Sequence, residues 1–162
     1  MGYSEGAMMA ASVVLEEQRL ARGPGARPRR VRGCVFFGGW PPWVRVGGYA
    51  HLVLRDMLDD VVDVPTFHVV GSHDPYLQGG LALYNVCHED RATLFEHGQA
   101  HNIPRDAQTV AELVAGILEL ADDAAAFEID AGDEDDDGDD APGDGPKPAM
   151  ATDAGAVATE AA

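Results

Sequence analysis

Apolar runs of different lengths alternate along residues 1–120 and predict helices and strands in turn. Residues 7–15 form a run of small and apolar residues that suits a buried helix, and charged residues close this run at 16–19. Residues 31–37 form a short, nearly continuous apolar run, which is typical of a parallel strand covered on both faces. A further strand is predicted at 66–70. This succession indicates an α/β fold, in which helices flank a parallel sheet.

The other elements follow from breaks in the apolar pattern. The prolines within Trp40–Trp43 cannot continue a central strand, so this segment is predicted to be a loop at the strand's carboxyl end. Its tryptophans either cap the core, which we favour, or line a substrate pocket. A helix is predicted over 51–62, a second strand-like run covers 92–96, and another helix follows Asp106 as its N-cap. That helix has apolar residues at amphipathic spacing: Val110, Leu113, Val114, Ile117 and Leu118.

Negative charge is concentrated near the end of the chain. Residues 1–120 carry 10 arginines and 14 acidic side chains, whereas residues 121–162 carry 14 acidic side chains and one lysine, so most of the net charge of −17 lies in the second part. That part cannot bury enough apolar surface to offset the entropy that is lost on ordering. Its aspartates do not match the spacing of a calcium-binding EF-hand loop. We therefore predict a folded domain at 1–120 and a disordered acidic tail at 121–162.

Composition also disfavours several classes of partner. No apolar run is long enough to span a bilayer, and we find no secretory signal. Cys34 and Cys87 lie in or beside apolar stretches, which favours buried, reduced thiols in a cytoplasmic protein. The arginines of a Pro/Gly-rich connector suit a surface loop better than a phosphate-binding patch: Arg27, Arg29, Arg30 and Arg32. We therefore expect neither a nucleic-acid partner nor a membrane partner.

A histidine pair raises the question of a metal site. His97 and His101 are four residues apart, a spacing that would place both rings on one face of a helix. Gly98 and Pro104 favour a loop at this segment instead, and a structural zinc site would need further Cys or His at regular spacing. We expect no metal and no cofactor.

The glycine-flanked Ser4 gives the sharpest chemical signal. In the stretch Gly2-Tyr3-Ser4-Glu5-Gly6, the glycines suit a nucleophile elbow, a strained turn between a strand and a helix that leaves little room two residues to either side of the serine. The helix predicted at 7–15 fits this arrangement. The alternative is a flexible N-terminal segment rich in Gly and Ser.

Two later residues could complete a catalytic triad with Ser4. Asp74 comes just after the strand predicted at 66–70, and His101 lies in a loop after the run at 92–96. The chain order Ser, Asp, His is that of the α/β-hydrolases, in which the carboxylate orients the imidazole that takes the serine proton. Alternatively, Asp74 only initiates a turn or caps the following segment. We expect His73 to be a loop histidine.

These motifs together resemble the fungal serine hydrolase family of the α/β-hydrolase superfamily, and most closely its esterases and thioesterases found beside polyketide synthases. The resemblance runs from Gly2 to about Leu120 and rests on four segments: Gly2–Ala7, Phe36–Pro42, His68–Tyr76 and Glu96–Asp106. It implies Ser4 as nucleophile, Asp74 as acid and His101 as base. It also implies that the backbone N–H of Glu5 contributes to the oxyanion hole.

The chain departs from the family pattern in two respects. Ala100 stands where the family usually has Gly, which narrows the allowed backbone conformation. Family members also have strands and helices before the serine, including the loop that supplies a second oxyanion donor. We therefore expect residues 1–120 to be the C-terminal part of an α/β-hydrolase domain that is truncated at its N-terminus. Its first strands would be missing and the strand leading into the elbow would be unformed.

Two function hypotheses follow. The chain is a serine hydrolase that cleaves a small-molecule acyl ester or thioester, carrier-bound polyketides included, in polyketide or other secondary-metabolite biosynthesis. Alternatively, it is a catalytically inactive hydrolase remnant, or a binding protein whose acidic tail engages a basic partner. The sequence leaves the acyl substrate and the oligomeric state open.

Overall fold

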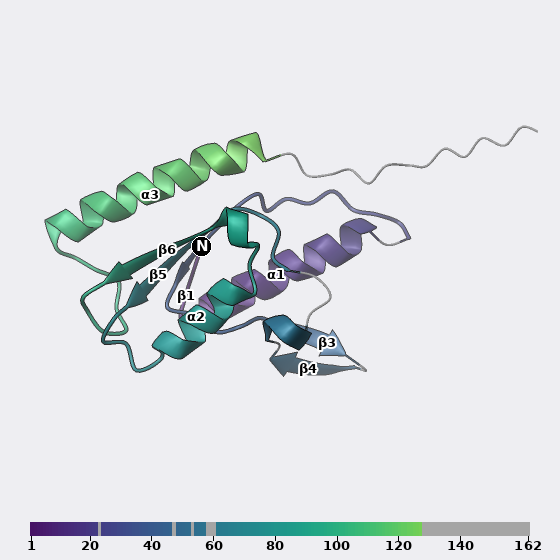
Figure 1. Cartoon of the computed structure of the whole chain (residues 1–162). Helices are drawn as coiled ribbons and strands as arrows, with labels where there is room; N and C mark the ends of the chain where they lie inside the picture. Colours follow the sequence, from purple (N-terminus) through teal and green to yellow (C-terminus); the bar gives the residue numbers. More distant parts are fainter. Residues whose placement is uncertain (23, 47, 53, 58–60, 128–162) are drawn as a thin grey trace, which may run out of the picture. The chain divides into compact units, whose positions relative to one another are not determined.

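A parallel sheet organises the part of the chain that the computed structural model describes, residues 1–127 without 23, 47, 53 and 58–60 (Figure 1). Its strands, in spatial order, are β1 (Gly2–Tyr3), β2 (Cys34–Phe37), β5 (Thr66–Gly71) and β6 (Ala92–His97). Each neighbouring pair is parallel. The predicted α/β fold is confirmed: the apolar run at 31–37 contains β2, and the runs at 66–70 and 92–96 cover all but the last residue of β5 and β6.

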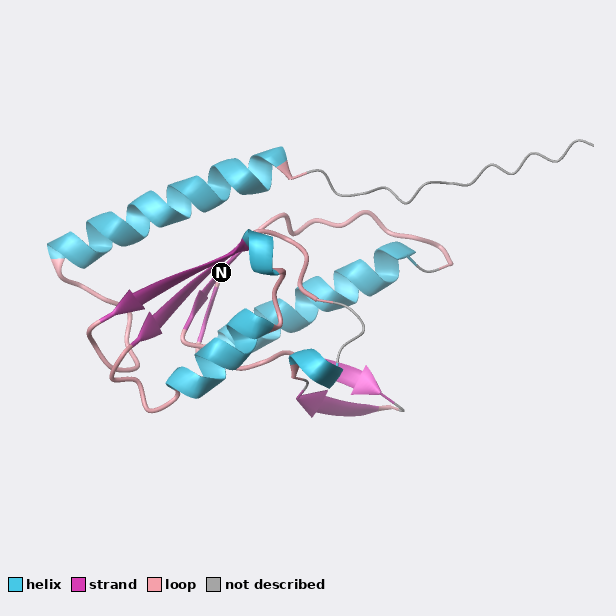
Figure 2. Ribbon diagram, viewed as in Figure 1, coloured by secondary structure: helices cyan, strands magenta, loops and turns pink. Residues whose placement is uncertain are grey.

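Helices cover both faces of this sheet (Figure 1, Figure 2). The helices α1 (Glu5–Arg22) and α2 (Leu77–Asn85) pack on one face, and α3 (Ala107–Ala126) packs on the other. Side chains alternate along β2, so that Phe36 lies in the core shared with α1 and α2, whereas Phe37 lies in the core shared with α3. This double burial explains why the sequence of β2 is apolar without interruption.

A short antiparallel hairpin replaces part of the helix predicted over 51–62. Its strands are β3 (Trp43–Val46) and β4 (Tyr49–Leu52), and the 3₁₀-helical turn η1 (Arg55–Met57) follows. The helix prediction is therefore wrong in the described part of this segment, and positions 53 and 58–60 lie outside the described residues. Gly48 adopts a φ of 88°, the left-handed conformation that a tight hairpin turn requires. The apolar residues between 51 and 62 are spaced in a way that also fits helical periodicity, which explains the wrong prediction.

The helix α3 passes the domain boundary that we predicted at residue 120. Asp106 caps its N-terminus, as predicted, because the side chain accepts a hydrogen bond from the Thr109 amide. The helix continues to Ala126, so the first six residues assigned to the tail are helical. Residues 121–126 are Ala-Asp-Asp-Ala-Ala-Ala, and alanine has the highest helix propensity. The rest of the predicted tail, from residue 128, lies outside the described residues.

The strand that leads into the elbow is formed, contrary to our expectation. Gly2 and Tyr3 make up β1 and pair in register with Phe36 and Phe37 of β2. Two residues are enough to form β1 because they pair with β2, which is a fully buried strand. Ser4 therefore leaves the sheet from a defined strand end.

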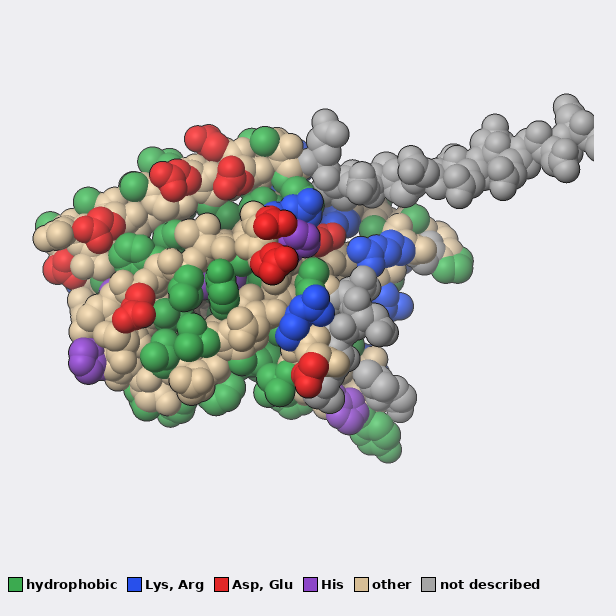
Figure 3. Space-filling view, in the orientation of Figure 1, with side chains coloured by type: hydrophobic (Ala, Val, Ile, Leu, Met, Phe, Trp, Pro, Cys, Tyr) green, Lys and Arg blue, Asp and Glu red, His purple; other side chains and the backbone are tan. Residues whose placement is uncertain are grey.

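The surface of α3 is acidic and only partly apolar. Figure 3 shows acidic side chains spaced along this helix on the face in view, and its acidic residues are all exposed: Glu112, Glu119, Asp122 and Asp123. Of the apolar positions predicted for this helix, Leu113 is buried in the core, whereas Val114 and Leu118 are exposed. No helix within the described ranges is long and apolar enough to cross a membrane.

Candidate active site

The three residues that the sequence singled out lie at the same edge of the sheet. Ser4 directly follows β1, Asp74 follows β5 by three residues, and His101 follows β6 by four. Because these strands are parallel, their carboxyl ends meet at one edge, which is where α/β sheets place their sites (Figure 1).

Ser4 occupies a strained turn between β1 and α1. Its φ is 53°, and it is the only non-glycine residue with a positive φ in the described part of the chain. The Ser4 amide donates to the Phe37 carbonyl at 2.8 Å, which fixes the turn to the neighbouring strand. A side chain at Gly2 would meet the Gly6 carbonyl oxygen at 2.3 Å, as an elbow requires. A side chain at Gly6 would meet no atom within 4 Å, so the steric argument holds for the first glycine only.

A continuous line of short contacts joins the three side chains. The distance from Asp74 Oδ2 to His101 Nδ1 is 2.6 Å, and the distance from His101 Nε2 to Ser4 Oγ is 3.0 Å. Exposure rises along the line: the Asp74 side chain is 3% exposed, the His101 side chain is 20% exposed, and Ser4 is half-buried. A carboxylate that is shielded from water interacts more strongly with the imidazole, and the hydroxyl at the other end remains reachable.

Asp74 uses both oxygens of its carboxylate. While Oδ2 faces His101, Oδ1 accepts a hydrogen bond of 2.7 Å from the amide of Tyr76, at the N-terminus of α2. The turn-forming role that we considered as an alternative and the contact with the histidine are therefore compatible in one side chain. The backbone bond fixes the rotamer that presents Oδ2 to the imidazole.

The loop that carries His101 is packed tightly against the end of β5. The His73 amide donates to the Gln99 carbonyl at 3.1 Å, and a side chain at Gly71 would meet the carbonyl oxygens of Gln99 and Ala100 at 2.4 Å. Ala100 has no left-handed φ, so the alanine that replaces the usual glycine fits this backbone without strain. His73 is exposed and holds the loop, in agreement with its assignment as a loop histidine.

Glu5 begins α1, so the backbone N–H of Glu5 belongs to the first turn of the helix. The first amides of a helix have no acceptor within the helix and lie at its positive end. The amide of Glu5 is therefore a candidate donor to an oxyanion that forms beside Ser4.

His97 and His101 do not form a pair of ligands on one helix. His97 is the last residue of β6 and is 6% exposed, and burial lowers the pKa of its imidazole. His101 lies in the loop that follows. Within the described ranges, no group of three or more His, Cys, Asp or Glu side chains could hold a metal ion.

Three residues that were not predicted as part of the site contact or closely approach the imidazole of His101: Tyr3, Gly38 and Tyr76. The rings of Tyr3 and Tyr76 have their centroids 5.2 Å and 5.3 Å from that of His101. Gly38 has a φ of 47° and lies directly against the imidazole. Their position in the sequence could have indicated them, because each is close to a predicted site residue or to the end of a predicted strand.

The tryptophans of the predicted loop lie on different elements. Trp40 packs on Gly79, where a side chain would come within 2.7 Å of its ring, and its centroid is 6.0 Å from that of Tyr76. Trp43 opens β3 and contacts the Met8 sulfur with its indole nitrogen. Trp43 also lines a hollow between α1 and β3, so the choice between a capping role and a pocket-lining role stays open for it.

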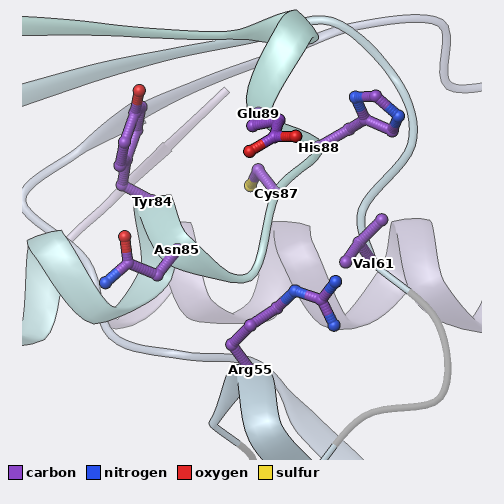
Figure 4. A pocket seen from close by; sticks show the side chains of 7 residues that line it. All are labelled: Arg55, Val61, Tyr84, Asn85, Cys87, His88 and Glu89. Atoms are coloured by element: carbon purple, nitrogen blue, oxygen red, sulfur yellow. The ribbon is translucent and has the colours of Figure 1, made fainter.

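Two hollows lie apart from the triad. One, of about 280 Å³, is bordered by Arg55, Tyr84, Cys87 and Glu89, and Figure 4 shows Arg55 reaching up from one side with Cys87 and Glu89 on the other. The second, of about 600 Å³, lies between α1 and β3. No residue of the triad lines either one.

Comparison with known proteins identifies the family. The family model described as Serine hydrolase (FSH1) matches residues 1–113 of the chain. Hydrolase phiM of Talaromyces stipitatus is 30% identical over 125 residues, which cover 74% of this chain and 48% of the relative. Esterase FPY3 of Fusarium mangiferae is 28% identical, with 72% of this chain and 53% of the relative covered. Esterase FUS5 of Gibberella moniliformis is 30% identical, with 74% and 45% covered.

The chain spans about half the length of these curated relatives. No solved structure gives a significant match. The family model covers well over half of the chain and includes all three residues of the hydrogen-bonded line. The resemblance to fungal serine hydrolases is confirmed, and the chain belongs to the serine hydrolase (FSH1) family.

Proposed function

We propose that this protein hydrolyses acyl esters, with Ser4 as nucleophile, His101 as general base and acid, and Asp74 as the residue that orients His101. The observation that carries the proposal is the continuous contact from Asp74 Oδ2 through the imidazole to Ser4 Oγ, with steps of 2.6 Å and 3.0 Å. Nucleophile, base and orienting group within hydrogen-bond reach are the signature of an activated serine.

Acylation begins when Ser4 Oγ attacks the ester carbonyl carbon while its proton passes to His101 Nε2. The electron pair of the C=O bond moves to oxygen, and the N–H of Glu5 donates to the oxyanion that results. Collapse of this intermediate expels the alcohol, which takes the proton from Nε2. Water then attacks the acyl-enzyme by the same steps, which release the acid and restore the Ser4 hydroxyl.

Asp74 supports this cycle from the opposite side of the ring. Its Oδ2 accepts from Nδ1–H, which leaves the lone pair of Nε2 free to receive the Ser4 proton. When Nε2 is protonated, the carboxylate stabilises the imidazolium. Its own position is held by the Tyr76 amide, so it does not need to reorganise during the reaction.

The substrate class that we propose is a small-molecule acyl ester, since two of the relatives cited above are named esterases. We extend it to thioesters because attack by Ser4 would form the same acyl-enzyme and expel a thiol in place of an alcohol. A role in secondary metabolism, with carrier-bound polyketides among the substrates, rests on the family resemblance alone. The buried, free Cys34 and Cys87 support a reducing compartment, the cytoplasm.

Labelling with a fluorophosphonate probe tests the proposal on the full chain. The wild type should label and Ser4→Ala should not. Ser72→Ala is the matched control, because Ser72 lies in the loop two residues before Asp74 and its hydroxyl contacts the His97 carbonyl. A folded wild type that never labels would show that the chain has no serine hydrolase activity, whereas a Ser4→Ala variant that labels as well as the wild type would show that Ser4 is not the nucleophile. The first of these outcomes would favour the inactive remnant or a binding protein.

A further inference from the structure

We propose that Tyr3 is a positioning residue that holds the backbone of His101 while the adjacent Ser4 engages the side chain of the same histidine. The inference rests on the proposed function, because it concerns the geometry of that relay. It assigns Tyr3 a role beyond packing.

Two consecutive residues hold His101 at two different points. The hydroxyl of Tyr3 donates to the carbonyl oxygen of His101 at 3.0 Å, and Ser4 Oγ lies 3.0 Å from Nε2 of its ring. The peptide bond between Tyr3, the last residue of β1, and Ser4 connects these two contacts directly. The separation between the nucleophile and the base is therefore set by one short, rigid segment of chain.

The ring of Tyr3 also restricts the imidazole. Its centroid lies 5.2 Å from that of His101 at an interplanar angle of 31°, and the ring of Tyr76 meets the imidazole edge-on at 5.3 Å and 83°. Both rings contact the imidazole, so a rotation of the imidazole toward either ring would have to displace that ring. Aromatic contacts of this geometry are favourable beyond the area they bury.

Other contacts restrain the histidine loop on both sides of this point. The Gln99 carbonyl is held by the His73 amide, and the Gln99 side chain donates to Asp106 at 3.1 Å. Asn102 and Ile103, which follow His101, are exposed. Asn102 is hydrogen-bonded to Gln99 and Ala100 within the loop, whereas the bond from Tyr3 joins the histidine itself to the end of β1.

Core packing does not account for the position of Tyr3. Tyr3 is 43% exposed, so burial of apolar surface contributes little to holding its ring in this place. An exposed hydrogen bond contributes little to folding, whereas an error of about 1 Å between reacting groups can cost on the order of 100-fold in rate. We therefore expect loss of the hydroxyl to affect the relay more than the fold.

Tyr3→Phe keeps the ring and removes only the hydroxyl. The matched control is Tyr84→Phe, which removes a hydroxyl that contacts the Ala92 carbonyl at 3.4 Å, away from the triad. The second-order rate of fluorophosphonate labelling should fall about 10-fold in Tyr3→Phe, with little change in Tm, and should be unchanged in Tyr84→Phe. With an ester substrate the loss should appear in kcat and not in KM. Equal labelling rates for Tyr3→Phe and the wild type would overturn the inference and leave the proposed function intact.

A second measurement does not depend on catalysis. The ring resonances of His101 in NMR spectra should be sharp in the wild type and in Tyr84→Phe, and should broaden in Tyr3→Phe as the ring samples more positions. Unchanged resonances in Tyr3→Phe would also overturn the inference. A wild type that does not label would refute the proposed function, and the NMR comparison would then decide the role of Tyr3 by itself.

Discussion

The backbone of Gly38 lies against the imidazole of His101, so that a side-chain carbon at Gly38 would come within 3.1 Å of both Nδ1 and Cε1 of the ring. The same carbon would lie 3.3 Å from Asp74 Oδ2. Gly38 also has a φ of 47°, in the left-handed region that favours glycine. The backbone at Gly38, directly after β2, thus packs closely against the contact between His101 and Asp74.

Gly38→Ala should therefore impair the site more than the fold. The strained φ should cost about 1–2 kcal/mol of stability, and the methyl group should displace the imidazole and lower the labelling rate of Ser4 about 100-fold. Gly25→Ala is the matched control, since Gly25 has a φ of 75° but open space around it. Chemical denaturation and probe labelling of both variants check this. A Gly38→Ala protein that labels as fast as Gly25→Ala would show that the close packing of Gly38 against His101 is not needed for the reactivity of Ser4.

Asp74→Asn should leave the fold intact and nearly abolish activity. The carbonyl oxygen of Asn can still accept from the Tyr76 amide, so its NH₂ group would face Nδ1 of His101. Nδ1 would then have to be the acceptor, and Nε2 would carry the proton and could not take one from Ser4. We expect kcat to fall roughly 10⁴-fold. An unchanged kcat would exclude Asp74 from the relay, and exposed Asp90→Asn serves as the control.

His68 should make the fold sensitive to acid. This histidine of β5 is 1% exposed, between the rings of Phe36 and Tyr84, and burial lowers the pKa of its imidazole to about 3. Between the ordinary pKa near 6.5 and about 3, the unfolded chain binds a proton at this residue that the folded chain does not. Stability should therefore be unaffected by His68 above pH 6.5 and should fall as the pH drops below that value.

Urea denaturation at pH 7 and pH 4.5 measures this effect. Each pH unit in the window corresponds to about 1.4 kcal/mol, and two units lie between pH 6.5 and pH 4.5, so the wild type should lose about 2–3 kcal/mol more than His68→Gln. His51→Gln, at an exposed position of β4, should behave like the wild type. Equal losses in the wild type and His68→Gln would show that His68 is not responsible for the acid sensitivity.

The sequence predicted the central strands of the sheet well because β2 and β5 are buried on both faces. The continuous apolar run of β2 reflects burial on both faces, whereas β1 and β6 are partly exposed. Asp74 and His101 each follow a predicted strand-like run, and Ser4 stands in the predicted elbow. Strand ends of a parallel sheet converge, so placing residues there was enough to predict that they meet. The distances and the second contact of Asp74 depend on tertiary packing and could not be predicted.

The hairpin and the end of α3 were missed for different physical reasons. In the hairpin, exposed strands lack the burial that produces a clear pattern, and every residue of β4 is exposed. At the end of α3, residues 121–126 share the small and acidic composition of the tail, although their alanines extend a helix readily. Tyr3 and Gly38 were missed because their roles lie in contacts across about 60 to 100 residues of sequence, which no local pattern reports.

The distances along the chain between the triad residues have a kinetic consequence. His101 lies 97 residues from Ser4 and 27 residues from Asp74. Contacts of such long range form only after the chain between them has lost the entropy of loop closure. No short segment that folds alone can therefore bring Ser4, Asp74 and His101 together. The reactivity of the Ser4 hydroxyl, followed during refolding, would therefore report when the native arrangement of the strands has formed.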